Sequence, residues 1–239
     1  MLILAVEQSS RNCGLAVLED EKVVAEREWD GVALRGSGLF FSLKSLLAEI
    51  SVSCKSISCY VVDIGPGSYS GIRSSLAAVL AFTLPEKQPI YAFSSAEVIA
   101  FEILMDWNLK KAGPSSPTMK KNCPGPGKVQ VVGDARRRQW WTAVYENAGG
   151  NLPLVRQKIG LVPENEFKPD PDALIVSPDW ARLKDRLTAT TSKGARIVEN
   201  SCVPTAAALG KLAYRKIRAN IPGEPLAPVY LHAAVAQKG

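Results

Sequence analysis

The fold is decided by residues 2–28, LILAVEQSSRNCGLAVLEDEKVVAERE, at the start of the chain. Leu2–Val6 is a continuous apolar run of strand length, and a polar turn follows it. Cys13–Leu18 and Lys22–Glu28 read as two further strands, separated by a second short turn. Because these turns are too short to hold crossover helices, the stretch predicts an antiparallel meander of three strands. A plain doubly wound sheet, which needs a helix between its first strands, is therefore excluded.

The rest of the first half alternates helices and strands. Tyr60–Ile64 reads as a strand, and Gly65-Pro66-Gly67 interrupts it before a helix that begins at Ser70. A strand at Ile90–Phe93 and a helix at Ala96–Met105, capped by the serines before it, follow. Between the meander and these elements, apolar residues spaced by three and four predict another helix: Leu39, Phe40, Leu43, Leu46, Leu47 and Ile50.

The pattern restarts after residues 112–127, which hold four prolines and three glycines and cannot continue a helix or a sheet. Three strands come first and shorter strands and helices follow, as in the first half. The predicted elements are strands at Val129–Asp134, Trp140–Tyr145, Leu152–Lys158, Ala173–Val176 and Ala195–Val198, a weaker helix near Pro178–Leu187, and a helix from Thr205 to about Arg218.

This repeated order predicts an α/β protein with two tandem ribonuclease H-like lobes, each a mixed sheet flanked by helices. A tandem pair of such lobes is the plan of actin, Hsp70 and sugar kinases. We expect a first lobe at 1–111 that carries dimerisation helices, a linker or loop at 112–127, and a second lobe at 128–239. The helix at 204–219 is a candidate to pack back on the first lobe.

Composition excludes several classes of protein. Hydrophobic residues make up 46% and charged residues 22% of the 239 residues, which is typical of a globular protein. No apolar run is long enough to span a membrane, and Met1–Val6 lacks the basic start of a signal peptide. The five cysteines form no Cys-x-x-Cys pair, which favours a reducing compartment and a cytoplasmic protein. With one histidine, His232, neither a two-histidine metal site nor a metallopeptidase is expected.

The net charge of +6 is unevenly distributed along the chain. The interval Lys110–Arg138 contains one acid, Asp134, among eight basic residues: Lys110, Lys111, Lys120, Lys121, Lys128, Arg136, Arg137 and Arg138. A solvated charged loop and a surface that touches RNA both fit this pattern, and the sequence leaves the two open.

The stretch Asp63–Arg73, DIGPGSYSGIR, lies between a strand and a helix. A glycine-rich turn in this place can aim backbone N–H groups at an anion. No Gly-Lys-Ser/Thr follows, so the stretch is not a P-loop. The alternative is structural: Gly65 and Gly67 permit a tight turn, and Ser68 or Ser70 caps the helix.

The two helices on either side of this turn predict an interface with a second chain. The apolar stripe of helix 39–50 is wider than one buried face requires, and the helix after Ser70 is rich in small residues, which let another helix approach. The alternative is that the second lobe covers the surplus apolar surface of these helices. The predicted interface consists of Leu39, Phe40, Leu43, Leu46, Leu47, Gly65, Pro66, Gly67, Ser68, Tyr69, Ser70, Gly71, Arg73, Ser74, Ala77, Ala78 and Ala81.

Glu7 and Asp134 each end the first strand of a lobe, where nucleotide-using proteins of this fold hold metal and phosphate. Neither following turn contains a glycine, so bulky side chains would crowd a phosphate. We therefore treat both as vestigial nucleotide-site positions and expect no catalytic residue, metal or cofactor, save a nucleotide at a boundary with a partner. The rival functions are an actin-like-fold ATPase or small-molecule kinase, and a homodimeric binding protein that has lost its partner.

Trp140 and Trp141, next to three arginines, are a candidate platform on which nucleic-acid bases could stack. Adjacent strand residues point to opposite faces of a sheet, however. The alternative prediction is one tryptophan in the core and one on the surface.

Five motifs together resemble the TsaB (YeaZ) family, and the resemblance runs from end to end. The most specific is Gly65–Arg73, GPGSYSGIR. The others are Ile3–Ser9, Phe93–Ser95, Asp134–Arg136 and Pro228–His232. The chain departs from the family in having Glu7-Gln8-Ser9 for Asp-Thr-Ser, no histidine among Ser37–Phe41, and His232 for arginine.

This resemblance implies a tandem actin-like fold and a non-catalytic scaffold or activating subunit. Such subunits serve the bacterial machine that makes threonylcarbamoyladenosine at position 37 of tRNAs that decode ANN codons. It implies pairing, through the helices of the first lobe, with itself as a homodimer or with a TsaD-like subunit, which holds the metal and transfers the threonylcarbamoyl group. A TsaE-like ATPase joins them, and tRNA is met indirectly through the complex.

Overall fold

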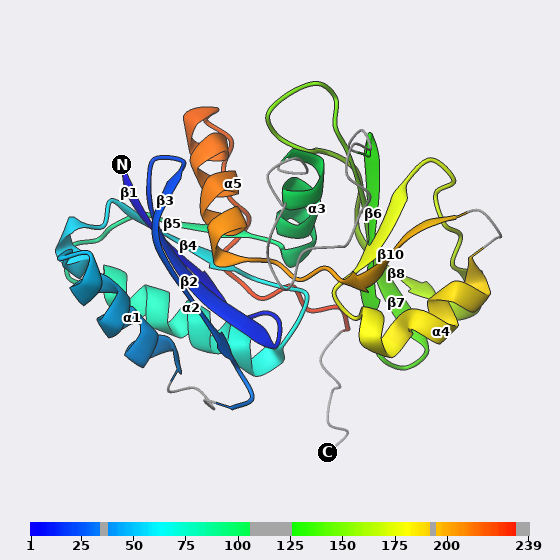
Figure 1. Ribbon diagram of the computed structural model, residues 1–239, viewed down its shortest axis with the longest axis horizontal. Helices are drawn as coiled ribbons and strands as arrows, with labels where there is room; N and C mark the ends of the chain where they lie inside the picture. Colours follow the sequence, from blue (N-terminus) through cyan, green and yellow to red (C-terminus); the bar gives the residue numbers. More distant parts are fainter. Residues whose placement is uncertain (34–37, 106–125, 192–194, 233–239) are drawn as a thin grey trace, which may run out of the picture.

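The computed structural model describes residues 1–33, 38–105, 126–191 and 195–232. Ser37, most of the 112–127 segment and the lysines at 110, 111, 120 and 121 lie outside this part of the chain. Two five-stranded sheets stand side by side, each flanked by helices (Figure 1). The predicted pair of ribonuclease H-like lobes is confirmed.

The first sheet has the strand order β3-β2-β1-β4-β5. Its first three strands form the predicted antiparallel meander, and β4 and β5 join it in parallel. Their bounds are Leu2–Glu7 for β1, Asn12–Glu19 for β2, Lys22–Asp30 for β3, Cys59–Asp63 for β4 and Ile90–Phe93 for β5. Since β1, β4 and β5 are parallel, their carboxyl ends meet at one edge of the sheet.

The second sheet repeats this plan with the order β10-β9-β6-β7-β8. Again the first three strands are antiparallel, and β9 and β10 add in parallel beside β6. The bounds are Lys128–Asp134 for β6, Gln139–Glu146 for β7, Leu154–Pro163 for β8, Leu174–Ser177 for β9 and Arg196–Ser201 for β10. Glu7 and Asp134 therefore occupy the same place in the two lobes.

Helices cover both faces of the first sheet. On β1, Leu4 and Val6 point into one core with α1 (Gly38–Glu49) and α2 (Tyr69–Thr83). Ile3 and Ala5 point the other way, into a core with α5 (Ala206–Arg218). The helix α5 thus comes from the second half of the chain and packs on the first sheet (Figure 1).

The second sheet is covered by α3 (Ser95–Met105) and α4 (Trp180–Thr190). Helix α3 stands between the lobes and is buried on nearly all sides (Figure 1). Ile99 and Ile103 pack with the second sheet, whereas Val98 and Phe101 pack with the first sheet and α5. A helix that is apolar all round is stable only when it is enclosed in this way.

Both faces of β7 are buried, which corrects the prediction for its two tryptophans. Trp140 is 0% and Trp141 2% exposed, because α4 covers one face of β7 and α3 the other. The expectation of one core and one surface tryptophan was wrong, and neither ring is open for stacking with a base.

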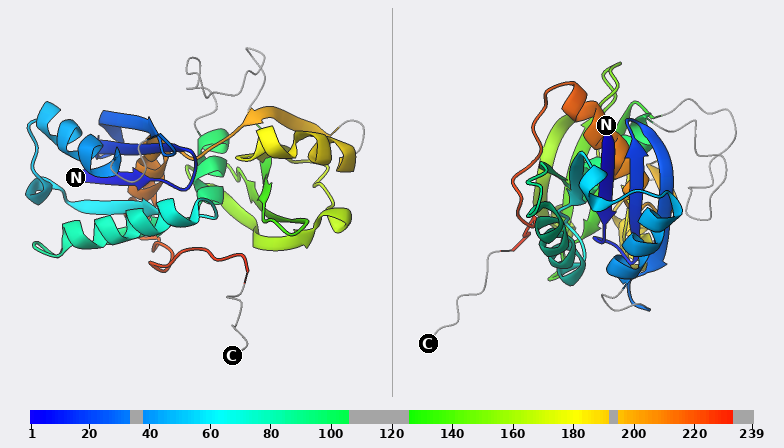
Figure 2. Two further views of the ribbon diagram at one scale, coloured as in Figure 1. Left: turned by 90° about the horizontal axis from the view of Figure 1, so that it is seen from below. Right: turned by 90° about the vertical axis from the view of Figure 1, so that its left-hand side faces the viewer.

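Beyond α5 the chain returns along the first lobe and reaches the second lobe at His232, the last described residue (Figure 2). The N–H groups of Glu224 and Val229 donate to the carbonyls of Ala92 and Ile64, at 2.8 and 2.9 Å. His232 then lies 2.7 Å, through Nε2, from the carbonyl oxygen of Ala135. In the described part of the chain, no helix has the length and apolar character needed to cross a membrane.

Candidate functional site

The glycine loop 65–71 packs directly against the turn after β1. A Cβ atom added at Gly67 would lie 2.1 Å from the carbonyl oxygen of Ser9, and one at Gly71 would lie 2.0 Å from that of Gln8. The N–H of Ser68 donates to the same Ser9 oxygen at 2.6 Å. These two glycines are therefore required by backbone contact between the loop and the turn.

The loop also uses its own N–H groups. Gly65 donates to Oδ1 of Asp63 at 2.6 Å, and Gly71 donates to the side chain of Ser68, which caps α2. With Ser68 bonded to Ser9, three backbone donors of the loop already have acceptors. This favours the structural explanation of the motif over an anion site.

Behind the loop, two carboxylates are buried side by side. Glu7 accepts from the N–H and the hydroxyl of Ser9, both at 2.5 Å, and Asp63 accepts from the hydroxyl of Ser95 at 2.7 Å. Burial, and then the charge of Asp63, raises the pKa of Glu7 well above its usual range. Burial likewise raises the pKa of Asp63 to about 7. The second oxygen of Glu7, Oε2, has no hydrogen-bond partner among the described residues.

The pair gives a testable pH dependence. Both pKa values are higher in the folded chain than in the unfolded chain, so folding favours the protonated acids. The fold is therefore most stable below about pH 4, and it loses this stability as the pH rises through about 7. Glu7→Gln keeps the acceptor for Ser9 and removes one acid. We expect it to raise the free energy of unfolding by about 2 kcal/mol at pH 8 and to change it little at pH 4. Urea denaturation at the two pH values measures this.

The control is Glu26→Gln, which removes an exposed acid from β3. It should shift stability by less than about 0.5 kcal/mol at either pH. Equal pH profiles for the wild type and Glu7→Gln would show that the buried pair is not strained by its charge.

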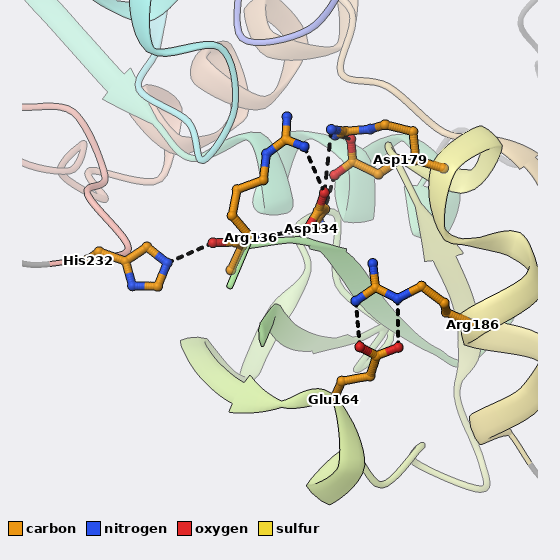
Figure 3. A network of polar contacts seen from close by, with 8 residues as sticks. Asp134, Arg136, Glu164, Asp179, Arg186 and His232 are labelled. Carbon is orange, nitrogen blue, oxygen red and sulfur yellow. Dashed lines mark hydrogen bonds and ion pairs between the residues drawn. The ribbon is translucent and has the colours of Figure 1, made fainter. Parts of the chain in front are cut away.

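Asp134, the corresponding residue of the second lobe, is held by arginines (Figure 3). Its Oδ2 lies 3.3 Å from Nη1 of Arg136 and 3.4 Å from Nη1 of Arg182. Its backbone N–H donates to Asp179 at 2.9 Å. Two guanidinium groups offset its charge, so Asp134 serves here to position arginines.

A cleft of about 1710 Å³ opens between the lobes. Gln8 and Ser9, the glycine loop, Asp134 and the start of α4 contribute to its walls, whereas Glu7 is fully buried behind Ser9. The carbonyls of Gln8 and Ser9 face the glycine loop, so this turn is committed to packing. Within the part of the chain that the structure describes, no three His, Cys, Asp or Glu side chains are placed to hold a metal ion.

The predicted helical interface needs a correction. Leu39, Leu43, Leu46 and Leu47 are at most 8% exposed and lie in the core of the first lobe itself. Because the core of the first lobe covers these four leucines, they cannot contact a partner chain. Ala78 is also buried, at 4%, and Gly65 and Pro66 are enclosed.

What remains exposed is a single stripe along α2. We call it the α2 stripe; it consists of Tyr69, Arg73, Ala77, Leu80, Ala81 and Leu84. These residues recur at spacings of three and four, so they share one face of the helix. Leu80 is 47% and Leu84 75% exposed. Gly67, Ser68 and Ser70 are exposed at its amino end, and Ser74 is half-buried beside it.

Two phenylalanines of α1 extend this surface. Phe40 is 57% and Phe41 75% exposed, and the ring of Phe40 meets that of Phe82 on α2 at 5.9 Å between centroids. Phe41, Leu80 and Leu84 were not among the residues predicted for the interface. The spacing of Tyr69, Arg73, Ala77 and Ala81 was the signal that could have found the two leucines.

Comparison with known proteins shows which proteins the chain is similar to. No protein-family model matches the chain. The chain is 28% identical over 191 residues to the tRNA threonylcarbamoyladenosine biosynthesis protein TsaB of Bacillus subtilis, which covers 78% of this chain and 68% of that protein. The solved structure of YeaZ from Pseudomonas aeruginosa matches 96% of the chain, and all of that chain, with a TM-score of 0.74 and 16% identity.

The chain is similar to TsaB proteins in sequence and shares its fold with YeaZ. A TsaB protein of Buchnera aphidicola is 25% identical over 99 residues, 41% of this chain and 47% of that protein. A second structure, of a protein with similarity to peptidase YeaZ from Pseudomonas aeruginosa, has a TM-score of 0.75 and 18% identity, with 97% and 99% of the two chains covered. At this level of identity, the two structures show that the chain shares their fold.

Proposed function

We propose that this chain is a non-catalytic scaffold or activating subunit in the biosynthesis of threonylcarbamoyladenosine at position 37 of tRNA. The names of the curated TsaB relatives support a place in this modification. The α2 stripe carries the rest of the proposal. It is an exposed apolar surface on a helix whose other side is already packed, and such surfaces mark contacts with other proteins.

We place a TsaD-like catalytic subunit, or a second copy of this chain, on the α2 stripe and the two phenylalanines of α1. Ala77 and Ala81 would let a partner helix approach closely, while Leu80 and Leu84 supply apolar area on either side. A TsaE-like ATPase would join this pair. The chain itself would hold no cofactor, and any nucleotide would lie at the boundary with its partner.

A stand-alone ATPase or kinase is less well supported. Glu7 is enclosed behind Ser9, and Asp134 is occupied by two arginines, so neither carboxylate is presented to a metal-bound phosphate. The four cysteines of the described residues are free thiols, which fits the reducing cytoplasm, where we place the protein.

Nucleoside analysis tests the function. Depletion of this chain from its native cell should lower threonylcarbamoyladenosine strongly in tRNAs that decode ANN codons, measured by liquid chromatography and mass spectrometry. Expression of the wild-type chain should restore it. Unchanged modification after complete depletion would remove the proposal, and ATP turnover by the purified chain that Asp134→Ala abolishes would support the rival.

A further inference from the structure

The turn between β6 and β7 presents three consecutive arginines in the left-handed backbone region. Arg136, Arg137 and Arg138 have φ values of 66°, 51° and 55°. Hydrogen bonds close the turn on both sides: the N–H of Ala135 donates to the carbonyl of Gln139 at 3.0 Å, and the N–H of Gln139 donates to that of Arg136 at 2.8 Å. Glycine or asparagine adopts this conformation with less strain than arginine does. The geometry of the turn therefore does not explain why arginine occupies all three positions.

These arginines form one wall of a pocket of about 960 Å³. Arg186 of α4 also lines this pocket, and it donates two hydrogen bonds of 2.6 Å to Glu164 (Figure 3). The guanidinium of Arg186 also lies 5.9 Å from the centroid of the buried ring of Trp140. These contacts hold Arg186 in a fixed orientation within the lining of the pocket.

The charges of this arginine pocket do not balance. Four arginines line it, against the two carboxylates of Asp134 and Glu164. Asp134 is paired with Arg136 and with Arg182 nearby, and Glu164 is paired with Arg186. Arg137 and Arg138 have exposed side chains that form no ion pair within 4.0 Å among the described residues. The hydrogen bonds from Arg186 lower the pKa of Glu164, and the charge of Arg138 adds to this effect. The pocket keeps an excess of two positive charges.

The lining decides between kinds of anion. Every side chain around the pocket is charged or polar. Sites for small organic ligands are mostly apolar, so a nucleoside or another ring-containing metabolite has nothing here to pack against. Planar guanidinium groups bind phosphate oxygens in pairs, and this is how proteins hold a nucleic-acid backbone without reading its bases.

We propose that the arginine pocket binds backbone phosphates of RNA, with Arg137 and Arg138 as the contacting residues and Arg186 as a fixed part of the lining. The RNA is the tRNA undergoing modification, and in this respect the inference rests on the proposed function. The contact is direct, in addition to whatever the catalytic subunit provides.

The test measures binding of the full chain, alone and with its TsaD-like partner, to an unmodified tRNA transcript that decodes ANN codons. Fluorescence anisotropy at several salt concentrations gives the dissociation constant and its salt slope. The double variant Arg137→Gln, Arg138→Gln should bind about tenfold more weakly, and its slope should be smaller by roughly one to two units, since each lost phosphate contact removes about 0.7–0.9.

Two further variants separate a lost contact from a damaged fold. Arg137→Gly removes the charge and relieves the backbone, so it should weaken binding while the thermal unfolding midpoint stays at or above that of the wild type. Arg218→Gln removes an exposed arginine at the end of α5 on the other lobe, and it should leave both affinity and salt slope unchanged.

If the double variant bound tRNA with wild-type affinity and salt slope, the inference would be overturned. It would also be overturned if the wild-type chain bound polyglutamate as tightly as tRNA, because that would indicate a general anion-binding surface. Complementation distinguishes this failure from that of the proposed function. If the wild-type chain does not restore threonylcarbamoyladenosine in depleted cells, the proposed function has failed. If the double variant restores it as fully as the wild type and binds tRNA equally well, only the arginine pocket has failed.

Discussion

Gly71→Ala is expected to lower the free energy of unfolding by about 3 kcal/mol or more, although the residue lies in a helix, where alanine is normally the better choice by about 1 kcal/mol. The reason is the 2.0 Å separation between the added Cβ and the carbonyl oxygen of Gln8. That oxygen belongs to the backbone of the turn after β1, so it cannot rotate away. Either α2 or the turn must move, and the bond from Ser68 to Ser9 is lost with it. Urea denaturation gives the value directly.

The matched control is Gly150→Ala. An added Cβ at Gly150 meets no atom within 4 Å, and its backbone is not in the left-handed region. The same substitution there should change stability by less than about 0.5 kcal/mol. If Gly71→Ala proved as mild as Gly150→Ala, the glycine loop would not be locked to the first turn, and its motif would again be free for an anion.

The order of elements was predictable because it depends on local patterns. The apolar run of Leu2–Val6 and the short turns after it allow only an antiparallel meander, and β1 to β3 form one. The same reasoning found the restart at Val129. Local periodicity and turn length decide such features, and distant parts of the chain do not change them.

Exposure was predicted less well, because it depends on which distant element covers each face. Leu43 was expected at an interface and one of the two tryptophans on the surface, yet Leu43, Trp140 and Trp141 are all in the core. The second face of β7 is covered by α3, which stands before it in the sequence by more than thirty residues. An amphipathic pattern says that a face is apolar and does not say which element packs against it.

The site shows the same division between local and distant causes. The sequence predicted that Gly65 and Gly67 permit a tight turn and placed Gly71 at an interface, but it could not reveal that the carbonyls of Ser9 and Gln8 lie against Gly67 and Gly71. The left-handed turn at Arg136–Arg138 had no signal at all, because arginine is not a residue that indicates this conformation. Its formation depends on the pairing of β6 with β7 on either side.

Ala77→Glu is expected to leave the chain folded and to weaken its association, with a TsaD-like subunit or with itself, by about 100-fold. Ala77 is exposed in the middle of the α2 stripe, between Arg73 and Ala81 on the same helix face. Glutamate is a good helix former, so the isolated chain loses only a few tenths of a kcal/mol. In a complex, however, the carboxylate would be buried without a partner and would hold the facing helix away.

Ala189→Glu on α4 makes the identical chemical change on an exposed helix of the second lobe. Sedimentation velocity over a range of concentrations and titration with the TsaD-like subunit should therefore give wild-type values for Ala189→Glu and a loss only for Ala77→Glu. Wild-type association in both variants would mean that the partner docks elsewhere, and the exposed phenylalanines of α1 would then need another explanation. A loss in both would indicate a general effect of charge. Only a loss confined to Ala77→Glu assigns the contact to the α2 stripe, because the two variants differ in position and in nothing else.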